Sequence, residues 1–235
     1  MTGWLTRLGL AAIIALLAPA LSPAPAASGG LAAIVQDDRG KPIADVIVSL
    51  TSPGPAPGLH PTPAVIDQQN KEFVPQILAV PLGTSVAFPN RDNIRHHVYS
   101  FSPAKRFELP LYIGTPAAPV VFDKPGVVVL GCNIHDWMVG YVYVLATPYF
   151  AKTAEDGKAH LADVPPGAYE ARVWHPRMKG EPEKTGKPIT IAAGVPGQVT
   201  FVVALKPERR GPQRPPYEGS SQSQVHDRPV KGGPS

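Results

Sequence analysis

The segment VVVLGCNIHDWMVGYVYVL, from Val127 to Leu145, contains the only cysteine of the 235-residue chain. A histidine and then a methionine follow this cysteine at intervals of three residues, as Cys132, His135 and Met138. Runs of β-branched and aromatic residues flank these three positions on both sides, and such runs favour β-strands. The segment therefore predicts two strands joined by a short loop that carries a thiol, an imidazole and a thioether.

The composition extends this prediction to the rest of the chain. It contains 30 Pro and 22 Gly among many short Val/Ile runs, which favours all-β structure with frequent turns. No helical periodicity follows the N-terminal segment. At about 100–150 residues a domain, the length allows one or two domains, so we expect one or two β-sandwiches. The formal net charge is only +4 and the basic residues are scattered, which does not suggest a nucleic-acid partner.

The N-terminus has the three-part pattern of a secretory signal peptide. Arg7 supplies a positive charge, an apolar run covers residues 8–21, and Ala24-Pro25-Ala26 forms a small-residue cleavage site. We therefore expect residues 1–26 to be a signal peptide. The mature protein should then be exported, to the periplasm if the source is a Gram-negative bacterium.

A membrane anchor is the alternative interpretation of this N-terminal run. A span needs about 20 consecutive apolar residues, and Pro19 and Pro23 interrupt this run. No later stretch is long and apolar enough, so we expect no stable membrane span after cleavage.

Export also raises a question about Cys132, because exported proteins usually pair their cysteines. A lone thiol in an oxidising compartment is buried and inert, paired between chains, or occupied by a ligand.

Turn signals predict how the flanking strands connect. We expect residues 31–50 to form a hairpin around Asp38-Arg39-Gly40. Two further hairpin-like pairs should follow, with turns at Glu155-Asp156-Gly157 and Pro165-Pro166-Gly167. Residues 207–235 are polar and rich in Pro, Gly and Ser, so we expect a disordered tail.

The thiol, imidazole and thioether suit copper. Two histidines, one cysteine and a weak axial methionine form the electron-transfer type of copper site. A second histidine must then come from elsewhere in the chain, and His96 and His97 are the candidates. Strand alternation places these two on opposite faces. Both faces have apolar members, so alternation leaves the choice between them open.

Two motifs resemble those of a known family. NRDNIRHHV, residues 90–98, resembles the N-x-D-x-x-x-H-x-V motif of plastocyanin-like cupredoxins. GCNIHDWMVGYVYV, residues 131–144, is similar to their cysteine-to-methionine loop and last strand, and the short loop is most similar to that of amicyanin. The resemblance runs from Ala64 to Ala146. It implies a Greek-key cupredoxin β-sandwich over residues 60–146.

The resemblance also implies a metal site, although this chain differs from the family at two positions close to the implied ligands. It implies one type 1 copper ion held by His96, Cys132, His135 and Met138. Where the family commonly has asparagine after the first ligand histidine, this chain has His97. Where plastocyanin has a tyrosine before the cysteine, this chain has Gly131, so an aromatic electron route through that position is not expected.

The flanking segments show a second resemblance. DDRGKPIADVIVSL, residues 37–50, and TAEDGKAHLADVPPGAYEARVW, residues 153–174, look like the two halves of a carboxypeptidase regulatory-like β-sandwich. We therefore expect a second, discontinuous sandwich over residues 30–58 and 147–206, into which the cupredoxin unit is inserted. The whole arrangement resembles an exported bacterial group described as methylamine-utilisation proteins.

Together these features predict an exported one-electron carrier rather than an enzyme. No second cluster of histidines or carboxylates appears at ligand spacing, and a single cysteine excludes a binuclear site of the two-cysteine kind. The expected partner is a redox protein such as a c-type cytochrome or a dehydrogenase. Copper handling without an electron-shuttle role is the alternative function. A structural module that has kept the fold without metal is the third.

Overall fold

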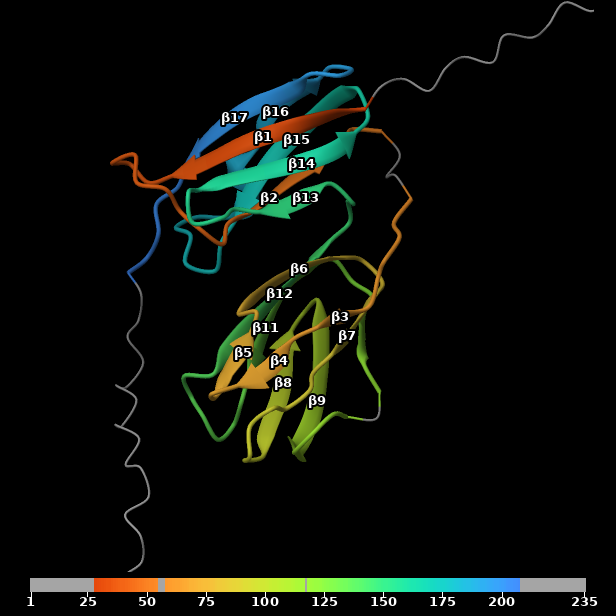
Figure 1. Ribbon diagram of the computed structural model, residues 1–235, viewed down its shortest axis with the longest axis vertical. Helices are drawn as coiled ribbons and strands as arrows, with labels where there is room; N and C mark the ends of the chain where they lie inside the picture. The colour runs from red at the N-terminus through yellow and green to blue at the C-terminus, as the bar shows by residue number, and fades with distance from the viewer. Residues whose placement is uncertain (1–27, 55–57, 117, 208–235) are drawn as a thin grey trace, which may run out of the picture.

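The computed structural model describes residues 28–54, 58–116 and 118–207. The predicted signal peptide lies outside these residues, as does the predicted tail beyond Pro207. The described part is all-β, which confirms the predicted class, with 17 strands and one short 3-10 helix, η1 (Pro182–Thr185). None of its helices has the length and hydropathy needed to cross a membrane. Figure 1 shows two layered bodies of strands, one above the other.

The first body is built from both ends of the described chain, and we call it the terminal sandwich. Its core contains buried residues of both facing sheets, among them Val35, Leu50, Leu161 and Val173. One sheet has three strands in the order β14-β1-β17, and the other has four in the order β13-β2-β15-β16. The strands are β1 (Gly29–Gln36), β2 (Ile47–Thr51), β13 (Phe150–Lys152), β14 (Lys158–Val164), β15 (Gly167–Trp174), β16 (Lys187–Ile191) and β17 (Pro196–Val202).

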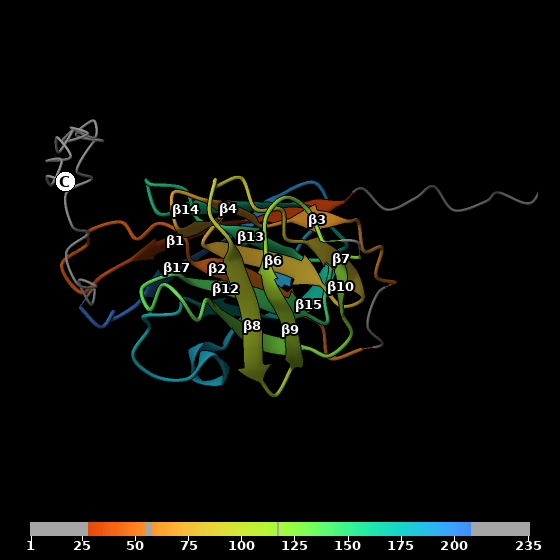
Figure 2. The ribbon, with the colours of Figure 1, turned by 90° about the horizontal axis from the view of Figure 1, so that it is seen from below.

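The second body, the central sandwich, is built from the strands in between. Its larger sheet has five strands in the order β6-β12-β11-β8-β9, and a three-stranded sheet has the order β10-β7-β3. The strands are β3 (Ala64–Val65), β6 (Ile77–Pro81), β7 (Thr84–Ala87), β8 (His96–Ser102), β9 (Lys105–Tyr112), β10 (Val120–Phe122), β11 (Gly126–Gly131) and β12 (Val139–Leu145). A separate two-stranded hairpin joins β4 (Asp67–Gln69) to β5 (Glu72–Val74). Viewed from below, β8 and β9 lie in front (Figure 2).

The predicted hairpins of the flanking segments are wrong as pairs of strands, although a single antiparallel bridge joins Gln36 to Pro42 beside the first turn. The turn at residues 38–40 exists, and the Asp37 carboxylate accepts the backbone N–H groups of Arg39 and Lys41 at 2.9 and 2.8 Å. However, β1 pairs with β14 and β17, whereas β2 pairs with β13 and β15. The two later turns likewise carry the chain from one sheet to the other. β1 and β2 thus face each other across the core instead of pairing, and the same is true of β13 with β14 and of β14 with β15.

Strand alternation on β12 explains how the two sandwiches meet. Val142 and Val144 are buried in the central core, and the alternate residues Tyr141 and Tyr143 face the other way. On that outer face the Tyr143 ring lies 4.8 Å from the Trp174 ring of the terminal sandwich. A separate apolar cluster forms there, with buried Ile47, Ile77, Leu145 and Trp174. The terminal sandwich therefore covers part of the outer face of the five-stranded sheet.

Candidate metal centre

Three chemically distinctive side chains converge at one end of the five-stranded sheet. β11 and β12 are antiparallel, with Gly131 opposite Val139, so Cys132 and His135 lie on the loop that joins them. β8 runs antiparallel to β11, and its Tyr99 pairs with Gly131. The first residue of β8, His96, is thereby brought to the same end of the sheet as the loop.

The ligand atoms of these three residues are close together and shielded from water. The Sγ atom of Cys132 lies 3.9 Å from His96 Nδ1 and 3.8 Å from His135 Nδ1. All three atoms lie within 4.8 Å of one another, which is a spacing that could hold a metal ion. His96 is 0% exposed, Cys132 3% and His135 9%, so His135 is the member with most access to solvent.

The spacing and the donor set fit a shared ion. Metal–sulfur and metal–nitrogen bonds of about 2.3 and 2.0 Å, opened to about 120°, separate the two ligand atoms by about 3.7 Å. The observed separations of 3.8 and 3.9 Å are close to that value, and they are long for a hydrogen bond. Cys132 is also free of any disulfide. Among the described residues no other group of three His, Cys, Asp or Glu side chains has this spacing.

Met138 is the last residue of the loop that carries Cys132 and His135. It is 1% exposed and belongs to the same buried core cluster as Cys132. Its backbone N–H donates to the carbonyl of His135 at 2.9 Å, which closes the loop into a tight turn. The thioether is therefore buried in the core cluster that also contains the thiol.

The two adjacent histidines have different surroundings. His96 directs Nδ1 towards Cys132, whereas Nε2 of His97 lies 2.9 Å from the Glu108 carboxylate on β9. The ring of His97 packs against Tyr99 on the outer face of the sheet, with ring centroids 5.3 Å apart. The structure therefore brings His96, and not His97, together with Cys132 and His135.

Asp92 positions His96, a role that the sequence analysis did not assign. Its carboxylate lies 2.7 Å from His96 Nε2 and, being an acceptor only, takes the Nε2–H hydrogen bond. That bond leaves Nδ1 as the free ligand atom. The same carboxylate accepts the backbone N–H groups of Asn70 and Lys71, at 2.7 and 2.9 Å. Burial raises the pKa of Asp92, but the hydrogen bonds from His96, Lys71 and Asn70 outweigh burial and lower it.

Two local structures hold Asp92 in place. Asn70 and Lys71 form the tip of the β4–β5 hairpin, and both have positive φ values, 55° and 60°, as a tight two-residue turn requires. Asn90 supports the other side, because its side chain donates to the carbonyls of Ile94 and Tyr112 and accepts the N–H of Asp92. The Asn90 and Asp92 positions of the N-x-D-x-x-x-H motif thus have structural roles, and the four-residue spacing from Asp92 to His96 was the signal available in the sequence.

The electrostatics of His135 favour the neutral imidazole. Burial lowers its pKa, and the nearby His96 and Lys71 lower it further. A metal ligand must be the neutral imidazole, so this environment keeps His135 ready to bind. Its ring lies 4.9 Å from the His96 ring and 5.3 Å from the Trp137 ring. The indole Nε1 of Trp137 is buried and has no hydrogen-bond partner among the described residues.

No protein-family model matches the chain, and no curated protein sequence matches it. Among solved structures, it is similar to a purple cupredoxin from Nitrosopumilus maritimus, with 28% identity over 34% of this chain and 96% of that chain, at a TM-score of 0.30. It is similar to an oxidised amicyanin mutant, with 21% identity over 41% of this chain and 99% of that chain, at a TM-score of 0.33.

A copper-containing nitrite reductase from Thermus scotoductus SA-01 is also similar. The identity is 25%, over 48% of this chain and 28% of that chain, at a TM-score of 0.34. The chain itself is an all-β protein with a buried His–Cys–His cluster that could hold a metal ion.

Proposed function

We propose that this chain is an exported type 1 copper protein that carries single electrons. The observation that carries the proposal is the cluster of His96, Cys132 and His135, whose ligand atoms lie within 4.8 Å of one another in a nearly dry site. One thiolate and two imidazoles are the donor set that electron-transfer copper sites use. Met138, held in the same core cluster, is the proposed weak fourth ligand.

Each ligand residue would have a distinct role in holding the copper ion. When bound, copper would supply the one-electron chemistry by alternating between Cu(I) and Cu(II). Cys132 would bind as the thiolate, and His96 and His135 as neutral imidazoles through Nδ1. The ligands are held at strand ends and by tight turns, so they need to move little when an electron is gained or lost. Burial excludes water from the thiolate and from the two Nδ1 atoms.

His135 is the proposed point of electron exchange. It is the most exposed member of the cluster, at 9%, and its ring contacts Trp137. Ile134, beside it on the loop, is 48% exposed. An apolar rim around a partly exposed ligand suits brief contact with a partner, and we propose a c-type cytochrome or a dehydrogenase. The N-terminal signal pattern supports a periplasmic location, and the role does not require the chain to be an enzyme.

The test is spectroscopic. Adding Cu(II) to the full chain should produce an intense visible thiolate-to-copper band and a narrow hyperfine splitting in electron paramagnetic resonance. Cys132→Ala and His96→Ala should abolish both signals, whereas His97→Ala should retain them, because His97 faces Glu108 and not the cluster.

A colourless protein without a Cys132-dependent signal would overturn the electron-carrier proposal. Tight Cu(I) binding in that protein would indicate copper handling instead. Loss of the signal in His97→Ala with retention in His96→Ala would reverse the assignment of the histidine.

A further inference from the structure

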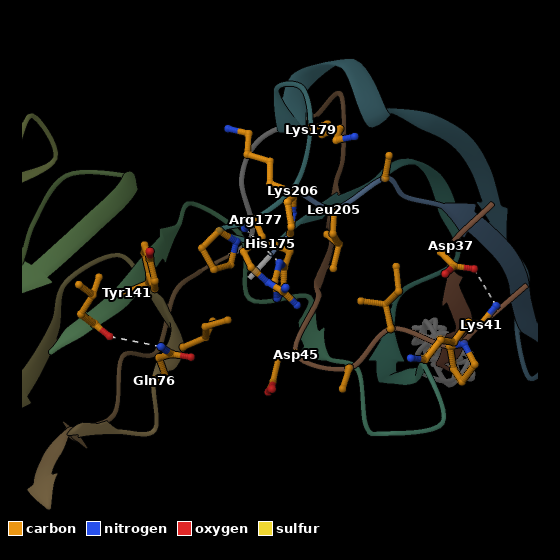
Figure 3. A pocket seen from close by; sticks show the side chains of 18 of the residues that line it. Asp37, Lys41, Asp45, Gln76, Tyr141, His175, Arg177, Lys179, Leu205 and Lys206 are labelled. Carbon is orange, nitrogen blue, oxygen red and sulfur yellow. Dashed lines mark hydrogen bonds between the residues drawn. The ribbon is translucent and has the colours of Figure 1, made fainter. Parts of the chain in front are cut away.

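A large groove lies between the two sandwiches and reaches the candidate metal centre. Its volume is about 1210 Å³. The metal-site loop contributes Trp137 to its wall, and the terminal sandwich contributes His175, Arg177 and Lys206 (Figure 3). Trp137 contacts His135 with ring centroids 5.3 Å apart. An occupant of this groove would therefore lie one aromatic ring away from a proposed copper ligand.

Strand-like pairing places three cations on the groove side of the terminal sandwich. Met178 and Leu205 form an antiparallel bridge, flanked by hydrogen bonds from Lys206 N–H to Arg177 O and from Lys179 N–H to Ala204 O. Met178 is buried in the core of the terminal sandwich, and Leu205 packs against that core. The flanking residues Arg177, Lys179 and Lys206 all line the groove, as does Leu205.

These three cations are not held in ion pairs by other described residues. Among the residues that the structure describes, no ion pair involves the side chain of Arg177, Lys179 or Lys206, although ion pairs are found elsewhere. Four carboxylates and a fourth cation, Lys41, also line the groove. Asp45 is paired with Lys152 at 2.8 Å, and Asp37 lies far along the groove from Arg177 (Figure 3). Asp38 adjoins Asp37, and Asp136 stands on the metal-site loop. The groove thus has a cationic end, at Arg177, Lys179 and Lys206, and an acidic end, at Asp37 and Asp38 with Lys41 (Figure 3).

We propose that this groove docks an acidic segment of the protein that exchanges electrons with the metal centre. The proposal rests on the proposed function and deepens it by naming the surface and the chemistry of the partner. The groove exceeds the 300–1,000 Å³ typical of small-molecule sites, which favours a protein segment. Electron-transfer complexes are small and transient. Complementary charge sets their association rate, so unpaired cations at the docking face give the terminal sandwich a role.

The first experiment measures docking without any metal. The full chain, labelled with nitrogen-15 and metal-free, is titrated with a hexaglutamate peptide at low ionic strength and followed by nuclear magnetic resonance. The shifts should concentrate at the Trp137 indole N–H and at the amides of Arg177, Lys179 and Lys206. Lys179→Glu with Lys206→Glu should weaken the affinity by about tenfold, because each reversal replaces an attraction by a repulsion.

The matched control reverses two exposed cations outside the groove, Arg106→Glu with Lys124→Glu, and changes the net charge equally. It should weaken the affinity far less, because neither residue lines the groove and the interaction between charges falls with distance. Equal weakening in both double variants, or shifts spread over the whole surface, would overturn the proposal. So would inorganic phosphate that produces the same shifts at equal concentration, which would indicate a small-anion site.

The second experiment links the groove to the metal centre. The copper-loaded chain is reduced by hexacyanoferrate(II), an anion that gives up one electron and becomes hexacyanoferrate(III). Lys179→Glu with Lys206→Glu should slow this reaction and should accelerate reduction by a cationic cobalt(II) phenanthroline complex. Unchanged rates with both reductants would overturn the link to electron transfer. A chain that takes up no copper would defeat the proposed function, while the metal-free titration would still decide whether the groove docks acidic segments.

Discussion

At the scale of single residues, Met138 has the role that is simplest to test. It is 1% exposed and lies in one core cluster with Cys132. A thioether stabilises Cu(I), and an amide oxygen is a harder ligand that favours Cu(II). Met138→Gln should therefore keep copper and lower the reduction potential by tens of millivolts, since a tenfold preference corresponds to about 59 mV for one electron.

A redox titration of the copper-loaded chain would measure this shift. Met138→Leu serves as the control, because it removes the thioether without adding an oxygen and should raise the potential. An unchanged potential in the Gln variant would contradict the axial role of Met138.

Asp92 is the residue whose role only the structure reveals. Its carboxylate holds His96 by a 2.7 Å hydrogen bond and is itself fixed by two backbone N–H groups. Outer-shell partners of this kind typically contribute 10–100-fold to metal affinity. Asp92→Ala should weaken copper binding by about that factor in a chelator competition. Asp67→Ala removes a carboxylate of the neighbouring hairpin that pairs with the exposed Arg91. It should leave the affinity unchanged, and equal losses in both variants would show that Asp92 has no special role.

Some parts of the metal centre could be predicted from the sequence and others could not, for physical reasons. The loop spacing places Cys132 and His135 near each other whatever the rest of the fold does. The choice between His96 and His97 depends on which face of β8 meets the loop, and alternation alone does not reveal it. Asp92 lies four residues before His96, but its orientation depends on a hairpin tip about 20 residues away in the sequence. Metal binding by Met138 stays a prediction.

At the scale of strands, Gly131 on β11 pairs with Tyr99 on β8. This pair explains why the chain has a glycine where plastocyanin has a tyrosine. A Cβ atom at Gly131 would lie 2.8 Å from Cζ of the Tyr99 ring, closer than atoms can pack. The aromatic side chain absent from β11 is thus replaced by one that reaches over from β8. Tyr99 also contacts Phe101, which is 70% exposed, at 5.2 Å between ring centroids.

This cross-strand packing makes a specific prediction for stability. Gly131→Ala should lower the free energy of unfolding by about 0.5–1.5 kcal/mol, the cost of forcing the Tyr99 ring off its rotamer. In a Tyr99→Ala background the same substitution should cost much less, because the clashing ring is gone. Urea unfolding of the four proteins gives the double-mutant cycle. Additive losses would mean that the destabilisation arises from the backbone of residue 131 and not from Tyr99.

The flanking hairpins show what strand patterns leave undetermined. The alternation and the turn residues at Asp38, Asp156 and Gly167 were sufficient to predict strands and turns. The same alternation and the same turn residues are found whether two consecutive strands pair within one sheet or face each other across a core. Gly157 illustrates the difference, because at a φ of 72° its added Cβ would lie 2.5 Å from the carbonyl oxygen of Val35. The turn at Gly157 therefore packs directly against β1, a long-range contact that local sequence patterns do not predict.

At the scale of the whole molecule, the terminal sandwich is assembled from two distant segments. β1 pairs in parallel with β17 and antiparallel with β14. Proteolytic cleavage between Thr51 and Ala64 should therefore leave the two fragments bound to each other. They should elute together in gel filtration and separate only in denaturant. Release of a stable fragment spanning residues 60–146 without its flanks would instead indicate tandem domains, so the predicted division into domains stays open to this experiment.

His175 lies where the two sandwiches meet, and it makes the stability of the molecule depend on pH. Burial and the nearby Arg177 lower its pKa to about 4, against 6.5 in an unfolded chain, while Asp45 acts in the opposite direction. Its Nδ1 also accepts the backbone N–H of Arg177 at 3.1 Å, which a protonated ring does not do. Between these two pKa values the unfolded chain binds the extra proton, so the contribution is complete above pH 6.5 and decreases towards pH 4.

The loss from pH 7 to pH 5 should be about 2 kcal/mol for this group, as an order of magnitude. Urea unfolding at the two pH values would measure it, with His175→Asn as the comparison, because the amide oxygen still accepts the Arg177 N–H but does not titrate. Other groups, including His135, titrate in both proteins, so only the difference between their pH dependences belongs to His175. A variant as sensitive to pH as the parent would show that His175 is not buried in its neutral form, and that the junction between the sandwiches is open to water.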